Sequence, residues 1–133
     1  ITTSGSATAY NTSSDYRLKE NVDYDWDATT RLKQLKPARF NFIVDDTTTV
    51  DGFIAHEVSS VVPEAISGTK DAMMDEEYEV TPAVMDGETI VTEAVMGTRS
   101  VPDMQGIDQS KLVPLLVKTI QELEARITAL ENA

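Results

Sequence analysis

Ser14 and Lys19 stand five positions apart in the stretch SSDYRLKENV, residues 13–22. A serine hydroxyl is a weak nucleophile unless a base within hydrogen-bond reach accepts its proton. Lysine is such a base only when it is neutral, which requires an apolar environment or a neighbouring cation. Arg17 offers that cation. By residue type and spacing, the pair is either a nucleophile with its base or a polar surface turn.

A short helix and a strand are expected after this stretch. Asp27 suits the N-cap of a helix that ends before Pro37, with Leu32 and Leu35 toward the core. The run ARFNFIV, residues 38–44, alternates apolar and polar side chains as a half-buried strand does. These two elements would begin the body of the protein.

The middle of the chain predicts more strands and one more helix. Residues 45–52 (DDTTTVDG) are interpreted as a turn-rich connector, and residues 52–55 (GFIA) as a short strand. A short helix before Pro63 would direct its valines inward: Val58, Val61 and Val62. The polar residues 67–77 are expected to be a loop.

Residues 78–97 contain two β-type runs around Asp86-Gly87, a strong signal for a tight hairpin. Residues 98–108 would then lead out of the sheet. The fold class expected from these elements is α+β, with a small antiparallel sheet, short helices and a long C-terminal helix.

Apolar residues recur in alternating steps of three and four near the C-terminus, which is the heptad pattern of a coiled coil. Asp108 or Ser110 can cap this helix, and Pro114 falls near its first turn. The predicted seam consists of Val113, Leu116, Ile120, Leu123, Ile127 and Leu130. About three heptads are marginal for an isolated coiled coil. A single amphipathic helix packed on its own domain is the alternative.

Two details favour a trimer of these helices. Leu112 and Val117 flank the seam and would widen it beyond that of a dimer. The run RITALE, from Arg126 to Glu131, resembles a pattern of parallel trimeric coiled coils in which Arg pairs with Glu of the neighbouring helix. Val or Ile at one seam position with Leu at the other instead favours a dimer. The two signals conflict.

The composition excludes several classes of protein. A formal net charge of -12 argues against binding to the phosphates of nucleic acid. The chain has one histidine and no cysteine, so disulfides and thiolate metal sites are excluded and no metal or cofactor is expected. No apolar run is long enough for a membrane span. Residues 1–12 have the composition of an extended β segment or of a disordered leader.

Other acidic residues could serve different chemistry. Asp45, Asp46, Glu57 and Glu64 could supply the paired carboxylates of a glycosidase, although their spacing singles out no pair. The run from Asp45 to Asp51 lacks the pattern of a calcium loop. Solvated surface charge is the simpler interpretation of these residues.

Four blocks in this order, SDYRLKENV, LKQLKPARFNF, DGFIAHEVSSVVPEA and DQSKLVPLLVKTIQELEARI, resemble the C-terminal intramolecular chaperone domain of bacteriophage tail spikes and tail fibres. This family is also known as the auto-processing endosialidase chaperone domain. The resemblance covers nearly all of residues 14–133. It implies a homotrimer that promotes trimerisation and folding of the upstream β-rich shaft of the same polypeptide and then cuts itself off.

The resemblance also implies which residues form the catalytic and cleavage site. Ser14 and Lys19 would be the catalytic dyad of a single-turnover serine peptidase, with cleavage at Ser14–Asp15. Arg17 and His56 are possible auxiliary residues. Many relatives have glutamine at the position of His56, and a structural histidine is the favoured interpretation there. Residues 1–14 would end the fibre stalk, residues 15–107 would form the chaperone body, and residues 108–133 the trimerisation helix.

The residues and the resemblance leave several candidates for the atom that attacks the peptide carbonyl. Attack by Ser14 Oγ on its own carbonyl would close a strained four-membered lactone. The remaining routes are attack on the Ser13 carbonyl in an N→O shift, attack by a serine of a neighbouring chain, activation of a water, and attack by the Asp15 carboxylate. The functional alternative is an uncut trimeric tip of the fibre that is structural or binds a receptor. The chaperone would act in the host cytoplasm during virion assembly and leave the mature fibre after cleavage.

Overall fold

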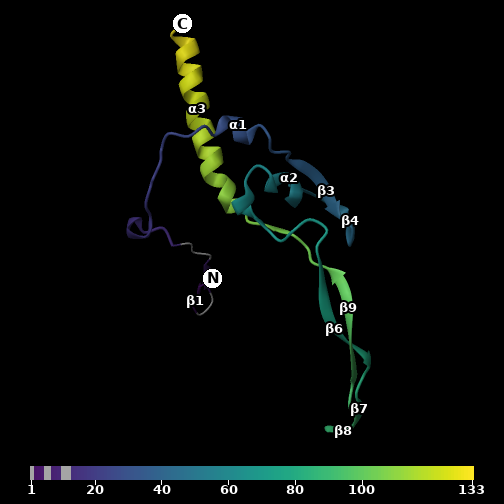
Figure 1. Ribbon diagram of the computed structural model, residues 1–133. Coiled ribbons are helices and arrows are strands. Elements are labelled where there is room, and N and C mark those ends of the chain that lie inside the picture. Colours follow the sequence, from purple (N-terminus) through teal and green to yellow (C-terminus); the bar gives the residue numbers. More distant parts are fainter. Residues whose placement is uncertain (1, 5–6, 10–12) are drawn as a thin grey trace.

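A computed structural model describes the backbone of residues 2–4, 7–9 and 13–133 and the side chains from residue 13 onward. The fold is α+β, as predicted, and the paired strands are antiparallel (Figure 1). Instead of one small sheet, the strands in these residues form separate two-stranded ribbons. The helical segments are η1 (Tyr16–Leu18), α1 (Thr29–Leu32), α2 (Ala55–Ser59), η2 (Pro63–Ala65), η3 (Gln109–Leu112) and α3 (Val113–Glu131).

The first ribbon of the body pairs β3 (Ala38–Phe42) with β4 (Asp45–Gly52). The interpretation of residues 45–52 as a connector is wrong, because the β-branched run Thr47–Val50 suits a strand and pairs with β3. The strand predicted at 52–55 is also wrong, since β4 ends at Gly52 and α2 begins at Ala55. Ile43 and Val44 form the turn.

A long ribbon projects from the body, away from α3 (Figure 1). It pairs β6 (Met73–Thr81) with β9 (Val95–Pro102), and β7 (Val84–Asp86) pairs with β8 (Thr89–Thr92) near its end. The hairpin predicted at Asp86-Gly87 is confirmed, with Gly87 at φ +63°. The predicted loop 67–77 and exit 98–108 are partly wrong. A ribbon exposed on both faces needs no alternation of apolar residues, so polar runs can form its strands.

A third short ribbon closes the base of this projection. It pairs β5 (Ile66–Ser67) with β10 (Gly106–Ile107). The backbone N–H of Asp108 also donates to the carbonyl of Ala65 at 2.7 Å. The chain therefore leaves the body after η2 and returns to it at the start of η3.

The core lies where α1, α2 and η2 pack against η3 and the first turns of α3. The three predicted valines are buried there, and Leu32 and Leu35 pack against them as expected. The buried residues are Ala28, Val58, Val61, Val62, Ala65, Leu112 and Leu115. α1 is shorter than the predicted helix, and the Asp27 carboxylate accepts a 3.2 Å hydrogen bond from Thr30 N.

α3 has one face on the body and another in solvent. Leu115 and Thr119 face the body and are each 3% exposed. The six seam positions stay between 41% and 75% exposed, so the helix does not use its heptad stripe to pack on its own domain. Leu112 is buried in the core and does not widen the seam as predicted. The structure is of one chain, and the coiled coil stays a prediction.

Asp108 caps the start of this helical region. Its carboxylate accepts a 3.1 Å hydrogen bond from the backbone N–H of Ser110, at the beginning of η3. Pro114 occupies the first turn of α3, where its missing N–H costs least. Both predictions from the sequence are thereby confirmed.

Near the N-terminus, β1 (Thr2–Ser4) pairs antiparallel with β2 (Ala7–Ala9). The prediction that residues 1–14 end a fibre stalk falls partly on residues 1, 5–6 and 10–12, outside the described residues. In the part of the chain that the structure describes, no helix is long and apolar enough to cross a membrane.

Candidate active site

The side chains of Ser14 and Lys19 meet across one helical turn. The 3-10 turn η1 lies between them, and backbone hydrogen bonds from Leu18 N to Asp15 O and from Lys19 N to Tyr16 O close it at 3.1 Å each. Lys19 Nζ donates to Ser14 Oγ at 2.8 Å. The five-residue spacing thus places the lysine within proton-transfer distance of the hydroxyl.

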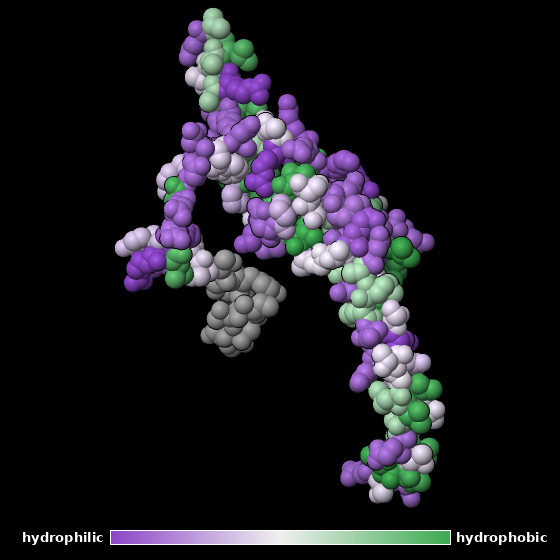
Figure 2. Space-filling view, in the orientation of Figure 1, coloured by the Kyte–Doolittle hydropathy of each residue, from purple (hydrophilic) through white to green (hydrophobic). Residues whose placement is uncertain are grey.

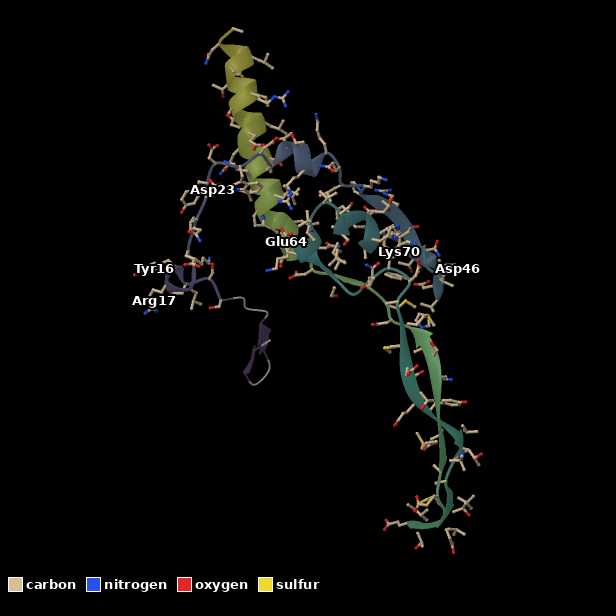
Figure 3. All side chains as sticks on the ribbon, viewed as in Figure 1. Tyr16, Arg17, Asp23, Asp46, Glu64 and Lys70 are labelled. Atoms are coloured by element: carbon tan, nitrogen blue, oxygen red, sulfur yellow. The ribbon has the colours of Figure 1, made fainter. Side chains whose placement is uncertain are left out.

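Asp15 and Arg17 form a separate ion pair within the same turn. The Asp15 carboxylate accepts from Arg17 Nε at 3.0 Å, from its terminal NH₂ group at 2.9 Å and from its backbone N at 2.9 Å. These contacts hold the pKa of Asp15 below its ordinary value. Arg17 was a candidate cation beside Lys19, but its charge is compensated by Asp15. Figure 3 shows Tyr16 and Arg17 at the outer edge of this turn.

Ser13, Ser14 and Lys19 line one side of an open cleft of about 780 Å³. The other walls come from the body and from the start of the C-terminal helix. They are Trp26, Arg31, Val62, Glu64, Ser110, Lys111, Val113, Pro114 and Leu115. The dyad therefore faces a groove that has an apolar floor and several charged side chains.

Arg31 and Lys111 of this cleft were not found from the sequence, and Glu64 was considered only as a carboxylate for glycoside hydrolysis. Arg31 donates to the carbonyl of Val61 at 2.8 Å, and its guanidinium lies 3.6 Å from the Glu64 carboxylate. Lys111 brings a further ammonium to the cleft from η3. No local motif marks these residues, because they come from three distant parts of the chain.

His56 lies elsewhere. It is exposed on α2 and lines another hollow, together with Lys70 and Asp71, that shares no residue with the dyad cleft. Lys70, which lines this second hollow, and Tyr16 stand on opposite sides of the molecule in Figure 3. The structure does not bring His56 together with Ser14 and Lys19.

The acidic residues considered for glycoside hydrolysis are not brought together. Asp45 and Asp46 lie on β4, while Glu57 on α2 pairs with Lys36 at 3.5 Å. Glu64 pairs with Arg31 in the dyad cleft. In the residues that the structure describes, no group of three or more His, Asp or Glu side chains is arranged to hold a metal ion.

The comparisons with known proteins found a similarity in the first half of the body. Residues 14–67 match the sequence model of a peptidase family described as "Chaperone of endosialidase". The matched segment begins at Ser14 and includes Lys19, Val58 of α2 and the two core valines that follow this helix. The resemblance predicted from the sequence is confirmed for this segment, and the description of the family supports a chaperone role. No curated protein matches the chain.

Proposed function

We propose that this chain is an intramolecular chaperone of a phage tail fibre or tail spike that releases itself by a single self-cleavage. It promotes trimerisation and folding of the upstream shaft and then cuts at Ser14–Asp15. The observation that carries the proposal is the 2.8 Å contact between Lys19 Nζ and Ser14 Oγ. This contact lies in the segment that matches the peptidase family described as "Chaperone of endosialidase". The same segment carries part of the resemblance to self-cleaving chaperone domains.

The chemistry uses Lys19 as the general base. Neutral Lys19 accepts a proton from Ser14 Oγ, or from a water that Ser14 orients, as the nucleophile attacks a peptide carbonyl. The resulting ammonium returns the proton to the leaving amine. Hydrolysis of Ser14–Asp15 consumes one water and leaves a carboxylate on Ser14 and an α-amine on Asp15. Each chain reacts once, because the serine belongs to the bond that breaks.

The geometry favours some routes over others. Both carboxylate oxygens of Asp15 accept hydrogen bonds from Arg17, which opposes their use as the attacking atoms. Ser14 Oγ has Lys19 as its partner and faces the open cleft. A water activated in the cleft gives cleavage after Ser14, and an N→O shift through the Ser13 carbonyl gives cleavage before it. Placement at Ser14–Asp15 follows the family resemblance.

Assembly would start at the exposed heptad stripe of α3. Six apolar side chains on this stripe are exposed in the single chain, and their spacing suits packing against copies of the same helix. Arg126 and Glu131 would pair across neighbouring helices. Gathering three chains at this end raises the local concentration of their shafts and sets their register before slow β-pairing begins.

The long ribbon is proposed to lie as an arm against the shaft. Its far end carries exposed apolar side chains, including Met85, Ile90 and Val91, which are at least half exposed. Figure 2 shows hydrophobic surface at this end of the ribbon. Asp71 and the acidic run 75–77 near the base of the ribbon would keep the arm soluble. An upstream shaft of the same polypeptide is the occupant we propose for this surface.

The remaining parts of the proposal follow from this role. The partners are two further copies of the chain and the attached shaft, with no nucleic acid, membrane or cofactor. The protein would act in the host cytoplasm during virion assembly and leave the mature fibre after cleavage. Loss of the folding aid then leaves the shaft kinetically trapped.

Intact-mass measurement of the wild-type chain and of Ser14→Ala tests the proposal. The wild type should give a fragment that begins at Asp15, and Ser14→Ala should stay whole. A fragment that begins at Ser14 instead would move the cut and favour the N→O route. A wild-type protein that stays uncut under all folding conditions would support the alternative, a permanent trimeric tip.

A further inference from the structure

The turn that carries Ser14 and Lys19 is held to the body mainly through the C-terminal helical region. Residues 13–25 are all exposed, with Tyr16 at 82% and Tyr24 at 84%. Residues 20–28, the strap, connect the dyad to α1. Lys118 Nζ of α3 donates to the carbonyl of Tyr24 in this strap at 2.8 Å. Five of the residues that line the dyad cleft, in the range 110–115, belong to the same helical region.

Glu122 fixes the other end of the strap. Its carboxylate accepts hydrogen bonds from Ala28 N at 2.9 Å and Thr29 N at 2.8 Å, and a third from Thr29 Oγ1. Backbone N–H groups at the start of a helix otherwise lack partners, and a carboxylate satisfies them with charge-assisted bonds. Ala28 is fully buried beneath this contact. The strap is therefore pinned at Tyr24 and again at Ala28–Thr29.

The two pinning residues share one stripe of α3. Lys118 and Glu122 are four residues apart, so they lie one above the other on the helix, next to buried Leu115 and Thr119. The seam residues Ile120 and Leu123 lie on another stripe and are exposed. One helix thus offers a stripe to other chains and a second stripe to the strap of the dyad.

We propose that Lys118 and Glu122 are positioning residues that make self-cleavage depend on assembly. This inference rests on the proposed function. In the single chain only one face of α3 packs on the body, so packing of its exposed seam against other copies would stabilise the helix further. An ordered α3 holds the strap through Lys118 and Glu122, and the strap then keeps Ser14 and Lys19 against the cleft wall. A chain that has not assembled holds its dyad less well and stays uncut.

The test uses the full chain made by cell-free synthesis, so that cleavage can be followed from the start. The variants are Glu122→Ala, Glu122→Gln, Lys118→Met and Lys118→Arg. Gln121→Ala is the matched control, on the same helix turn and without a strap contact. Each is measured for cleavage rate by intact mass, for assembled fraction by native mass spectrometry, and for hydrogen exchange of residues 20–29.

Glu122→Ala and Lys118→Met should slow cleavage about tenfold or more at an unchanged assembled fraction, because each loses charge-assisted hydrogen bonds to the strap. Exchange in residues 20–29 should rise in both. Lys118→Arg keeps a donor and Glu122→Gln keeps an acceptor, so both should recover part of the rate. Gln121→Ala should match the wild type in all three measurements.

Wild-type cleavage rates in Glu122→Ala and Lys118→Met, at equal assembly, would overturn the inference. A loss of cleavage that only follows a loss of assembled protein would assign these residues a structural role and would also overturn it. Failure of the proposed function looks different, since the wild type itself would then stay uncut.

Discussion

Lys19 Nζ donates a 2.8 Å hydrogen bond to Ser14 Oγ across the single turn Tyr16–Leu18. Both side chains are exposed in the single chain. A lysine acts as a base near neutral pH only when it is desolvated or lies beside another cation. The contact therefore sets the distance for proton transfer.

Removal of the base should leave an assembled but uncut protein. Lys19→Ala is expected to slow cleavage at least about 100-fold, the usual contribution of a general base. Lys19→Arg should be equally inactive, because a guanidinium does not give up its proton. Intact mass measures the cut and native mass spectrometry the assembly. Glu20→Ala, one residue along, serves as the control and should cut normally; rapid cutting by Lys19→Ala would eliminate Lys19 as the base.

The two faces of α3 should respond differently to substitution. Leu115→Ala should lower the free energy of unfolding by about 2–5 kcal/mol, because it opens a cavity in the core. Ile120→Asp, at a side chain 65% exposed, should leave the unfolding of the dilute chain nearly unchanged and abolish assembly. Urea unfolding and sedimentation velocity measure the two effects. Gln121→Asp adds the same charge beside the seam and should still assemble; trimers of Ile120→Asp would refute the seam.

The far end of the long ribbon should matter for the shaft and not for the chaperone body. Ile90→Asp, placed in the complete fibre, should reduce the yield of protease-resistant shaft trimers severalfold, because it removes apolar surface from the proposed arm. The unfolding of the isolated chaperone should stay the same. Thr89→Asp is the matched control on β8. Equal shaft yields for Ile90→Asp and wild type would count against the arm.

The contact of Glu122 with the strap should depend on pH. The pKa of Glu122 lies below its ordinary value. The largest cause is the hydrogen bond from the Thr29 side chain, the next is the hydrogen bond from the Ala28 backbone, and the charge of Lys118 contributes less. A lowered pKa in the folded state stabilises the fold above the unfolded-state pKa. This contribution is lost as the pH falls from about 4.3 through the lower folded value. Glu122 lines a hollow between α1 and α3, and the other charged groups that line it are Asp27, Lys33 and Arg126.

Urea unfolding between pH 7 and pH 3 checks this dependence, with Glu122→Gln as the comparison. The wild type should be the more stable of the two at pH 7, and the difference should shrink as the carboxyl is protonated. The other groups around the hollow are common to both proteins, so their titration cancels in the difference. A difference that stays constant with pH would contradict the role of the Glu122 charge.

Local patterns predicted much of this structure. The inward valines at 58, 61 and 62, the turn at Asp86-Gly87, the caps of the C-terminal helix and the Ser14–Lys19 pair all depend on residues close together in the sequence. The strand β4 was missed, and so were the parts of β6 and β9 that lie nearest the body. Thr-rich and acidic runs look like loops unless the partner strand is known, and that partner lies elsewhere in the chain.

The sequence by itself determined the contact between Ser14 and Lys19, because a five-residue spacing around one turn brings the two side chains together through short-range geometry alone. It also determined the heptad stripe of α3, since helical periodicity needs no tertiary contact. Only the tertiary structure decided that Leu112 belongs to the core and that Lys118 and Glu122 hold the strap. Lys118 and Glu122 lie more than 90 residues from the strap atoms they contact. Packing of the chain, and not the order of its residues, makes these contacts.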